Sequence, residues 1–191
     1  MPRLHLVIMA IICCAGCSSA PRGPYTPITE TSRNTAEAER LNREAIEVIE
    51  TDPEQAERLL REALTADLWH GPSHNSLGVL ALNKGSYYEA ANEFEWARKL
   101  MPGHPDPRMN LALTLERAGR FEEALAEYDS ALDVHPSHLP TMQAIARLQL
   151  RRNLADDRTA NLLSDIALRG EPEWRDWARR QASASAARSG N

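Results

Sequence analysis

The apolar residues of this chain follow a helical spacing from about residue 34 onward. A first stripe consists of Leu41, Ala45, Val48 and Ile49, whose spacing places them on one face of a helix. Asp52-Pro53 interrupts the stripe, and proline suits the first turn of a new helix. A second stripe follows, made of Ala56, Leu59, Leu60, Ala63 and Leu64. Residues 34–70 are therefore predicted to form a hairpin of two amphipathic helices.

This hairpin pattern then repeats with a period of 34 residues. Residues 71–104 and 105–138 align on each other without a gap. The positions that match are Leu77, Gly78, Gly85, Tyr87, Ala90, Phe94, Ala97 and Pro102 in one copy, and Leu111, Ala112, Gly119, Phe121, Ala124, Tyr128, Ala131 and Pro136 in the other. Such a fixed period is typical of an array in which each unit buries its apolar face against the next. The sequence therefore predicts an all-α solenoid of helical hairpins.

The matching positions have a physical logic. Gly78 and its equivalent Ala112 are small, so the two helices of a hairpin can approach closely, and Phe94 fills the space between them. Gly85 can adopt the left-handed conformation that ends a helix. Pro102 is placed to stop the second helix.

The repeat continues less regularly on both sides. Residues 34–70 form a first copy if one residue is deleted from the turn. Residues 139–172 form a divergent fourth copy if the turn between residues 151 and 157 carries two extra residues. That insertion would bring Ala160 and Ala167 to the two inward-facing alanine positions. The solenoid is thus expected to span residues 34–170.

A last helix is predicted over residues 171–183. Trp174, Trp177 and Ala178 share one face of it, and charged residues occupy the rest. We interpret this helix as a cap, since the final repeat of a solenoid otherwise exposes its core. The alternative is that the tryptophans form a partner-binding patch. Residues 184–191 consist mainly of Ala, Ser and Gly, and we expect a disordered tail there.

The matching positions resemble the signature of the tetratricopeptide repeat (TPR) family over about residues 34–172. The first signature position departs from it, because His74 and Arg108 stand where the family usually has tryptophan. The resemblance implies a right-handed superhelix that binds a protein or peptide partner in its concave groove. It also implies that residues of the leading helices line this groove, here Ile46, Asn75, Val79, Leu82, Met109, Leu113, Glu116, Arg117, Gln143, Arg147, Leu150 and Arg151.

The expected groove is apolar along its middle and carries three arginines toward its C-terminal end. It would suit an extended or helical peptide with apolar anchors and an acidic end. It does not resemble the two-carboxylate clamp of chaperone-binding repeats. That clamp needs lysine and arginine at positions that are Asn42, Asp106 and Asn110 in this chain.

The first residues have the features of a bacterial lipoprotein leader. Arg3 precedes an apolar run from Leu4 to Cys14 that is too short to span a bilayer, so residues 1–16 are predicted to be a signal peptide. The run ends in Cys-Ala-Gly-Cys, which resembles a lipobox and implies a covalent lipid on Cys17. The departure from the lipobox is Cys14, where the family usually has leucine.

Residues 17–33 would join the lipidated cysteine to the first helix. They hold Pro21, Gly23, Pro24 and Pro27 among serines and threonines, a composition that predicts a flexible tether. The residue after Cys17 is Ser18 and not an aspartate. By resemblance to Gram-negative lipoproteins, this implies sorting to the outer membrane, facing the periplasm.

Composition and motifs limit the chemistry that we expect. A formal net charge of -5 argues against a nucleic-acid-binding surface. The sequence contains no nucleophile elbow, phosphate-binding loop or His-Glu-x-x-His motif, and we therefore expect neither an enzyme nor a cofactor other than the lipid. His70, His104 and His138 recur with the repeat, but stacked helices lie about 8–10 Å apart, too far for histidines to share one metal ion. We expect turn residues there and no metal.

The sequence therefore predicts a membrane-anchored scaffold or adaptor that binds an unidentified protein or peptide, in assembly of an envelope complex. Lipoproteins of this build include pilus and secretin pilot proteins, which is one alternative. A second alternative is a structural lipoprotein that self-associates, which light scattering of the delipidated domain would identify. A third is a cell-wall-modifying enzyme, which turnover of purified peptidoglycan would identify.

Overall fold

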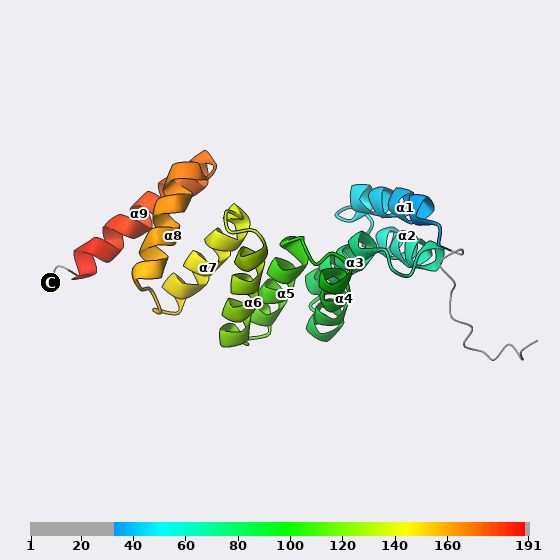
Figure 1. Ribbon diagram of the computed structural model, residues 1–191, viewed down its shortest axis with the longest axis horizontal. Coiled ribbons are helices and arrows are strands. Elements are labelled where there is room, and N and C mark those ends of the chain that lie inside the picture. Colours follow the sequence, from blue (N-terminus) through cyan, green and yellow to red (C-terminus); the bar gives the residue numbers. More distant parts are fainter. Residues whose placement is uncertain (1–32, 190–191) are drawn as a thin grey trace, which may run out of the picture.

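The computed structural model describes residues 33–189, and within this range the chain forms nine α-helices and no strand. The helices are α1 (Thr35–Val48), α2 (Pro53–Ala66), α3 (Gly71–Asn83), α4 (Tyr87–Leu100), α5 (Asp106–Arg117), α6 (Phe121–Val134), α7 (Leu139–Arg151), α8 (Asp157–Arg169) and α9 (Pro172–Ser189). They follow one another along an elongated array with α1 near one end and α9 at the other (Figure 1). The predicted all-α solenoid is confirmed.

Consecutive helices pair into four hairpins. The most extensive contacts join α1 to α2, α3 to α4 and α5 to α6, and α7 packs on α8 in the same way. Each second helix also packs against the first helix of the next hairpin, as α4 does against α5. The first helices contact one another directly, because α3 packs against both α1 and α5. The first helices therefore lie on the inner side of the array.

The small and aromatic positions of the repeat form the core. The residues of the second helices that are fully buried at these positions are Ala56, Leu60, Ala63, Ala90, Phe94, Ala97, Ala124, Tyr128 and Ala131. Gly78 lies directly against Phe94, since a Cβ atom added to Gly78 would stand 2.5 Å from a ring carbon. The missing side chain of Gly78 is thus what lets α3 approach α4, as the sequence predicted.

The turns inside the hairpins place a residue in the left-handed region. Gly85 has φ of 76° and Gly119 has φ of 80°, as expected for glycines that end helices. The equivalent residue after α7 is Asn153, with φ of 57°. The turn that contains Asn153 covers residues 152–156, two more than the turn at residues 84–86, so the predicted longer turn is confirmed.

The register predicted for α8 is wrong by one residue. Ala160 is exposed and Ala167 is half-buried. The buried positions instead hold Thr159, Leu163 and Ile166, which are respectively 1%, 2% and 0% exposed. The longer turn leaves α8 free to rotate, and the rotation buries the larger side chains of leucine and isoleucine in place of alanine.

Helix α9 covers the end of the array, as predicted for a cap. Ala178 is fully buried, and Trp174 and Trp177 pack against the core with their rings 5.2 Å apart, edge to face. The prediction of a disordered tail is wrong for residues 184–189, because α9 extends to Ser189. Alanine has the highest helix propensity, and four of residues 182–187 are alanine.

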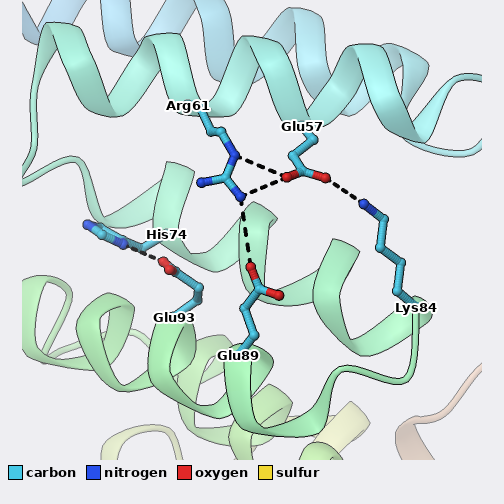
Figure 2. Close-up of polar contacts among 6 residues, drawn as sticks. All are labelled: Glu57, Arg61, His74, Lys84, Glu89 and Glu93. Carbon is cyan, nitrogen blue, oxygen red and sulfur yellow. Dashed lines mark hydrogen bonds and ion pairs between the residues drawn. The ribbon is translucent and has the colours of Figure 1, made fainter.

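Ion pairs connect the first hairpin to the second (Figure 2). On α2, Glu57 accepts hydrogen bonds from Arg61 at 2.7 Å and from Lys84 at the end of α3. Arg61 also lies 3.9 Å from Glu89 of α4. The cations of Lys84 and Arg61 lower the pKa of Glu57. These pairs join the outer surfaces of two neighbouring repeats.

The predicted signal peptide, Cys17 and most of the predicted tether lie outside the described residues. Within residues 33–189, none of the helices combines the length and the hydropathy that a bilayer span requires.

Candidate partner-binding groove

A pocket on the predicted groove lies between α5, α7 and α9. It has a volume of about 180 Å³ and is lined by Met109, Leu113, Tyr128, Pro140, Gln143, Ala144, Arg147 and Trp174. Met109, Leu113, Gln143 and Arg147 were predicted from the sequence as groove residues, and the structure brings these four together.

Helical spacing explains why these side chains meet. Met109 and Leu113 stand one turn apart on α5, and Gln143 and Arg147 stand one turn apart on α7, so each pair projects from one face of its helix. Helices α5 and α7 contact each other less than α3 and α5 do, which leaves space between them. Trp174 lines this space from the first turn of α9.

The sequence predicted only part of the role of Trp174. The sequence predicted Trp174 as part of a cap, with a partner-binding patch as the alternative. The structure gives it a position in both, because it packs against the core and also lines the pocket. No spacing rule within one repeat relates α9 to α5, so the sequence contained no signal for this contact.

Two arginines on this surface are not engaged by acidic side chains. Arg117 and Arg147 are exposed, and within residues 33–189 neither forms an ion pair. Arg151, the third predicted arginine, is also exposed but donates a hydrogen bond to Glu116. The surface beside the pocket is therefore positively charged at Arg117 and Arg147.

Glu116 lies inside the solenoid and is not available to a partner, which corrects its place in the predicted groove. It is 8% exposed and accepts hydrogen bonds from the hydroxyl of Tyr128 at 3.0 Å and from Arg151. Burial and the nearby Glu116 carboxylate raise the pKa of Tyr128, so that the tyrosine hydroxyl stays protonated and donates. Glu116 thus joins α5, α6 and α7.

Leu82 is a second correction, because it is 4% exposed and packs in the core at the last turn of α3. Asn75 is half-buried and accepts a hydrogen bond from Asn110 of α5 at 3.1 Å. Val79 and Leu150 are half-buried against the core, and Ile46 is 52% exposed on α1. The accessible groove therefore centres on α5 and α7.

The three positions where a two-carboxylate clamp needs lysine or arginine hold uncharged or acidic side chains in this chain. Asn42 accepts a hydrogen bond from Ser76 at 2.9 Å, and Asn110 donates to Asn75. Asp106 lies 3.2 Å from His138. These side chains bind neighbouring helices of the solenoid.

The repeated histidines occupy helix starts. His70 and His138 are the N-cap residues of α3 and α7, and their Nδ1 atoms lie 2.7 Å from the hydroxyls of Ser73 and Thr141. Burial lowers the pKa of His138, although Asp106 opposes this effect. In the part of the chain that the structure describes, no three His, Cys, Asp or Glu residues are arranged to hold a metal ion.

Comparison with known proteins gives the same repeat. Residues 81–148 match the family model described as tetratricopeptide repeat. The TPR repeat-containing thioredoxin TTL4 of Arabidopsis thaliana is 35% identical over 85 residues, which make up 44% of this chain but 12% of that protein.

Two solved structures share the fold. PilF of Pseudomonas aeruginosa has a TM-score of 0.65 at 17% identity, with coverage of 81% of this chain and 74% of that chain. The first TPR of Spaghetti (RPAP3), bound to the HSP90 peptide SRMEEVD, has a TM-score of 0.59 at 11% identity, with coverage of 64% of this chain and 98% of that chain. The family model therefore identifies residues 81–148 as tetratricopeptide repeat, and the two solved structures show the same helical-hairpin fold for the longer array.

Proposed function

We propose that this chain is a membrane-anchored scaffold that binds a segment of a partner protein in the groove between α5, α7 and α9. Tetratricopeptide repeats indicate a scaffold for protein–protein interaction. The observation that carries the proposal is the apolar pocket made by Met109, Leu113 and Trp174, with Arg147 at its side.

The size of the pocket favours a peptide side chain as its occupant. A volume of about 180 Å³ is below the range of about 300–1,000 Å³ that is usual for small-molecule sites. One apolar side chain of a peptide fits a site of this kind, while the rest of the peptide lies along the inner helices.

The charges beside the pocket favour an acidic residue next to that apolar anchor. Arg147 lines the pocket and Arg117 is exposed on α5, and within residues 33–189 both lack an ion-pair partner. A carboxylate of the partner would satisfy one or both guanidinium groups by charge-assisted hydrogen bonds.

Site-specific cross-linking tests the groove. A photoreactive phenylalanine analogue at Leu113 is expected to capture a partner in cells, and Arg147→Glu in the same chain is expected to abolish the capture. The matched control carries the analogue at Tyr88, which is 92% exposed on α4. Equal capture from both positions, or capture that survives Arg147→Glu, would contradict the groove. Capture of a second copy of the chain would favour self-association instead.

The membrane anchor is supported by the sequence before residue 33. Cys17 follows an apolar run and two small residues, in the arrangement that resembles a lipobox. We place the chain in the bacterial envelope, on the outer membrane facing the periplasm. Cys17→Ala should then accumulate as an unprocessed precursor without lipid. A Cys17→Ala protein that remained membrane-bound at unchanged mass would overturn the anchor but not the groove.

A further inference from the structure

A second apolar pocket lies at the opposite end of the solenoid from α9. Leu68 and Trp69 of the turn after α2, His74 of α3 and Trp96 of α4 line it, with a volume of about 160 Å³. Trp69 is 43% exposed and Trp96 is 39% exposed, which is unusual for side chains of this size. The proposed groove does not include any of these residues.

The aromatic rings form a pre-shaped surface. The centroids of Trp69 and Trp96 are 6.1 Å apart in an edge-to-face arrangement, and His74 stacks on Trp96 at 6.0 Å. His74 is fixed at both ring nitrogens, because Nε2 donates to the carbonyl of Leu68 at 3.0 Å and Nδ1 lies 2.7 Å from Glu93. Figure 2 shows the contact between His74 and Glu93.

The N-terminal part of the chain enters the described structure beside this pocket. Arg33 donates two hydrogen bonds to the carboxylate of Asp67, at 2.9 and 3.1 Å. Thr35 donates to the same carboxylate at 2.7 Å. Asp67 in turn accepts from the backbone N–H of Trp69 at 3.0 Å. Arg33 therefore contacts the turn that carries Leu68 and Trp69 of the pocket.

The sequence before Arg33 supplies a ligand of matching chemistry. Residues 24–27 read Pro-Tyr-Thr-Pro. In a polyproline-II helix, which has three residues per turn, Pro24 and Pro27 lie on the same edge. Proline-rich segments with this spacing bind to pockets lined by aromatic side chains. The six residue steps from Pro27 to Arg33 span up to about 19 Å at about 3.1 Å per residue, and Arg33 itself contacts the turn that carries Trp69.

We propose that residues 24–27 of the same chain bind the pocket formed by Leu68, Trp69, His74 and Trp96. The covalent link favours this occupant over a separate peptide, because a short linker gives an effective concentration on the order of millimolar. Docking holds the first hairpin close to residue 17 and shortens the free link between that residue and the solenoid. The proposal does not depend on the groove between α5, α7 and α9.

Cross-linking within the full chain tests this proposal. A photoreactive phenylalanine analogue at Tyr25 is expected to cross-link to residues 68–74 or 93–99, as mapped by mass spectrometry. Mixing isotope-labelled with unlabelled chains distinguishes links within one chain from links between copies. A synthetic peptide of residues 20–32, added at a concentration above the effective concentration of the linked segment, is expected to suppress the link.

Two sets of variants should abolish the same link. Trp69→Ala/Trp96→Ala removes the pocket, and circular dichroism reports whether the solenoid is still folded. Pro24→Ser/Pro27→Ser removes the ligand without changing any residue of the solenoid. Links only between copies, links only to the groove residues 109–147, or a link that persists in the Pro24→Ser/Pro27→Ser chain would each overturn the proposal.

Discussion

Tyr128 donates a buried hydrogen bond to Glu116 at 3.0 Å, and this contact joins the two helices of the third hairpin. Both residues are buried, and Arg151 of the next hairpin donates to the same carboxylate. The contact therefore lies at the junction of α5, α6 and α7, and Tyr128 also lines the pocket of the proposed groove.

Tyr128→Phe should lower the free energy of unfolding by about 1.5–3 kcal/mol, because it removes a hydrogen bond to a charged and buried carboxylate. Urea unfolding followed by circular dichroism measures the change. Tyr88→Phe is the matched control, since Tyr88 is 92% exposed and its hydroxyl is open to solvent. An equal effect of the two substitutions would show that the buried bond contributes nothing.

The same tyrosine predicts a loss of stability at alkaline pH. Burial and Glu116 raise the pKa of Tyr128 above its ordinary value of 10.0, so the unfolded chain releases this proton at a lower pH than the folded chain. Above about pH 10, the free energy of unfolding should fall by up to about 1.4 kcal/mol per pH unit for this group. Tyr128→Phe should make the alkaline slope shallower, and an unchanged slope in the variant would contradict the assignment.

Gly78→Ala should destabilise the solenoid by about 1–3 kcal/mol, because the added Cβ would lie 2.5 Å from the ring of Phe94. Thermal unfolding measures this. Gly103→Ala is the control, since a Cβ at that position meets nothing within 4 Å. If both variants melt alike, the close approach of α3 and α4 is not as the structure shows it.

Asn153→Gly should raise the free energy of unfolding, whereas Gly119→Ala should lower it by about 1 kcal/mol. Both residues have positive φ, at 57° and 80°, and only glycine adopts this region without steric cost. Urea unfolding under identical conditions measures the free energy of unfolding of both variants. A gain from Gly119→Ala would be incompatible with the left-handed turn.

Asp67 predicts a loss of stability in acid. Burial alone would raise the pKa of Asp67, but hydrogen bonds from Arg33 and Thr35 outweigh it and lower the pKa below the ordinary 3.8. The contribution of Asp67 is therefore present above pH 3.8 and is lost as the pH falls through the lowered pKa. Asp67→Asn should show a smaller stability difference between about pH 5 and about pH 3 than the parent chain. The reverse order would refute this account.

The sequence predicted those parts of the fold that depend on spacing. The period of 34 residues identified the hairpins, and Gly78, Gly85 and Gly119 have the roles that their positions indicated. The resemblance to tetratricopeptide repeats also predicted Met109, Leu113, Gln143 and Arg147 as groove residues, and the structure brings these four together.

Features that depend on contacts between distant repeats were not predictable in this way. Glu116 and Leu82 fit the groove pattern, but their burial depends on Tyr128 and on the packing of the next hairpin. The predicted register of α8 was wrong for a related reason. The alanine spacing indicated that Ala160 and Ala167 face inward, but the free energy gained by burying Leu163 and Ile166 determined the rotation of the helix.

The packing of α9 on α8 also bears on how an array of this kind changes in length during evolution. A duplicated copy of residues 105–138 could be inserted after His138. It would pack against a hairpin with the same buried alanine and aromatic positions as the hairpin that precedes residues 105–138 now. A copy added after α8 would instead have to displace α9, which is already packed on that helix. Gene duplication can therefore lengthen this protein from its middle, whereas its C-terminal hairpin must be inherited as a fixed end.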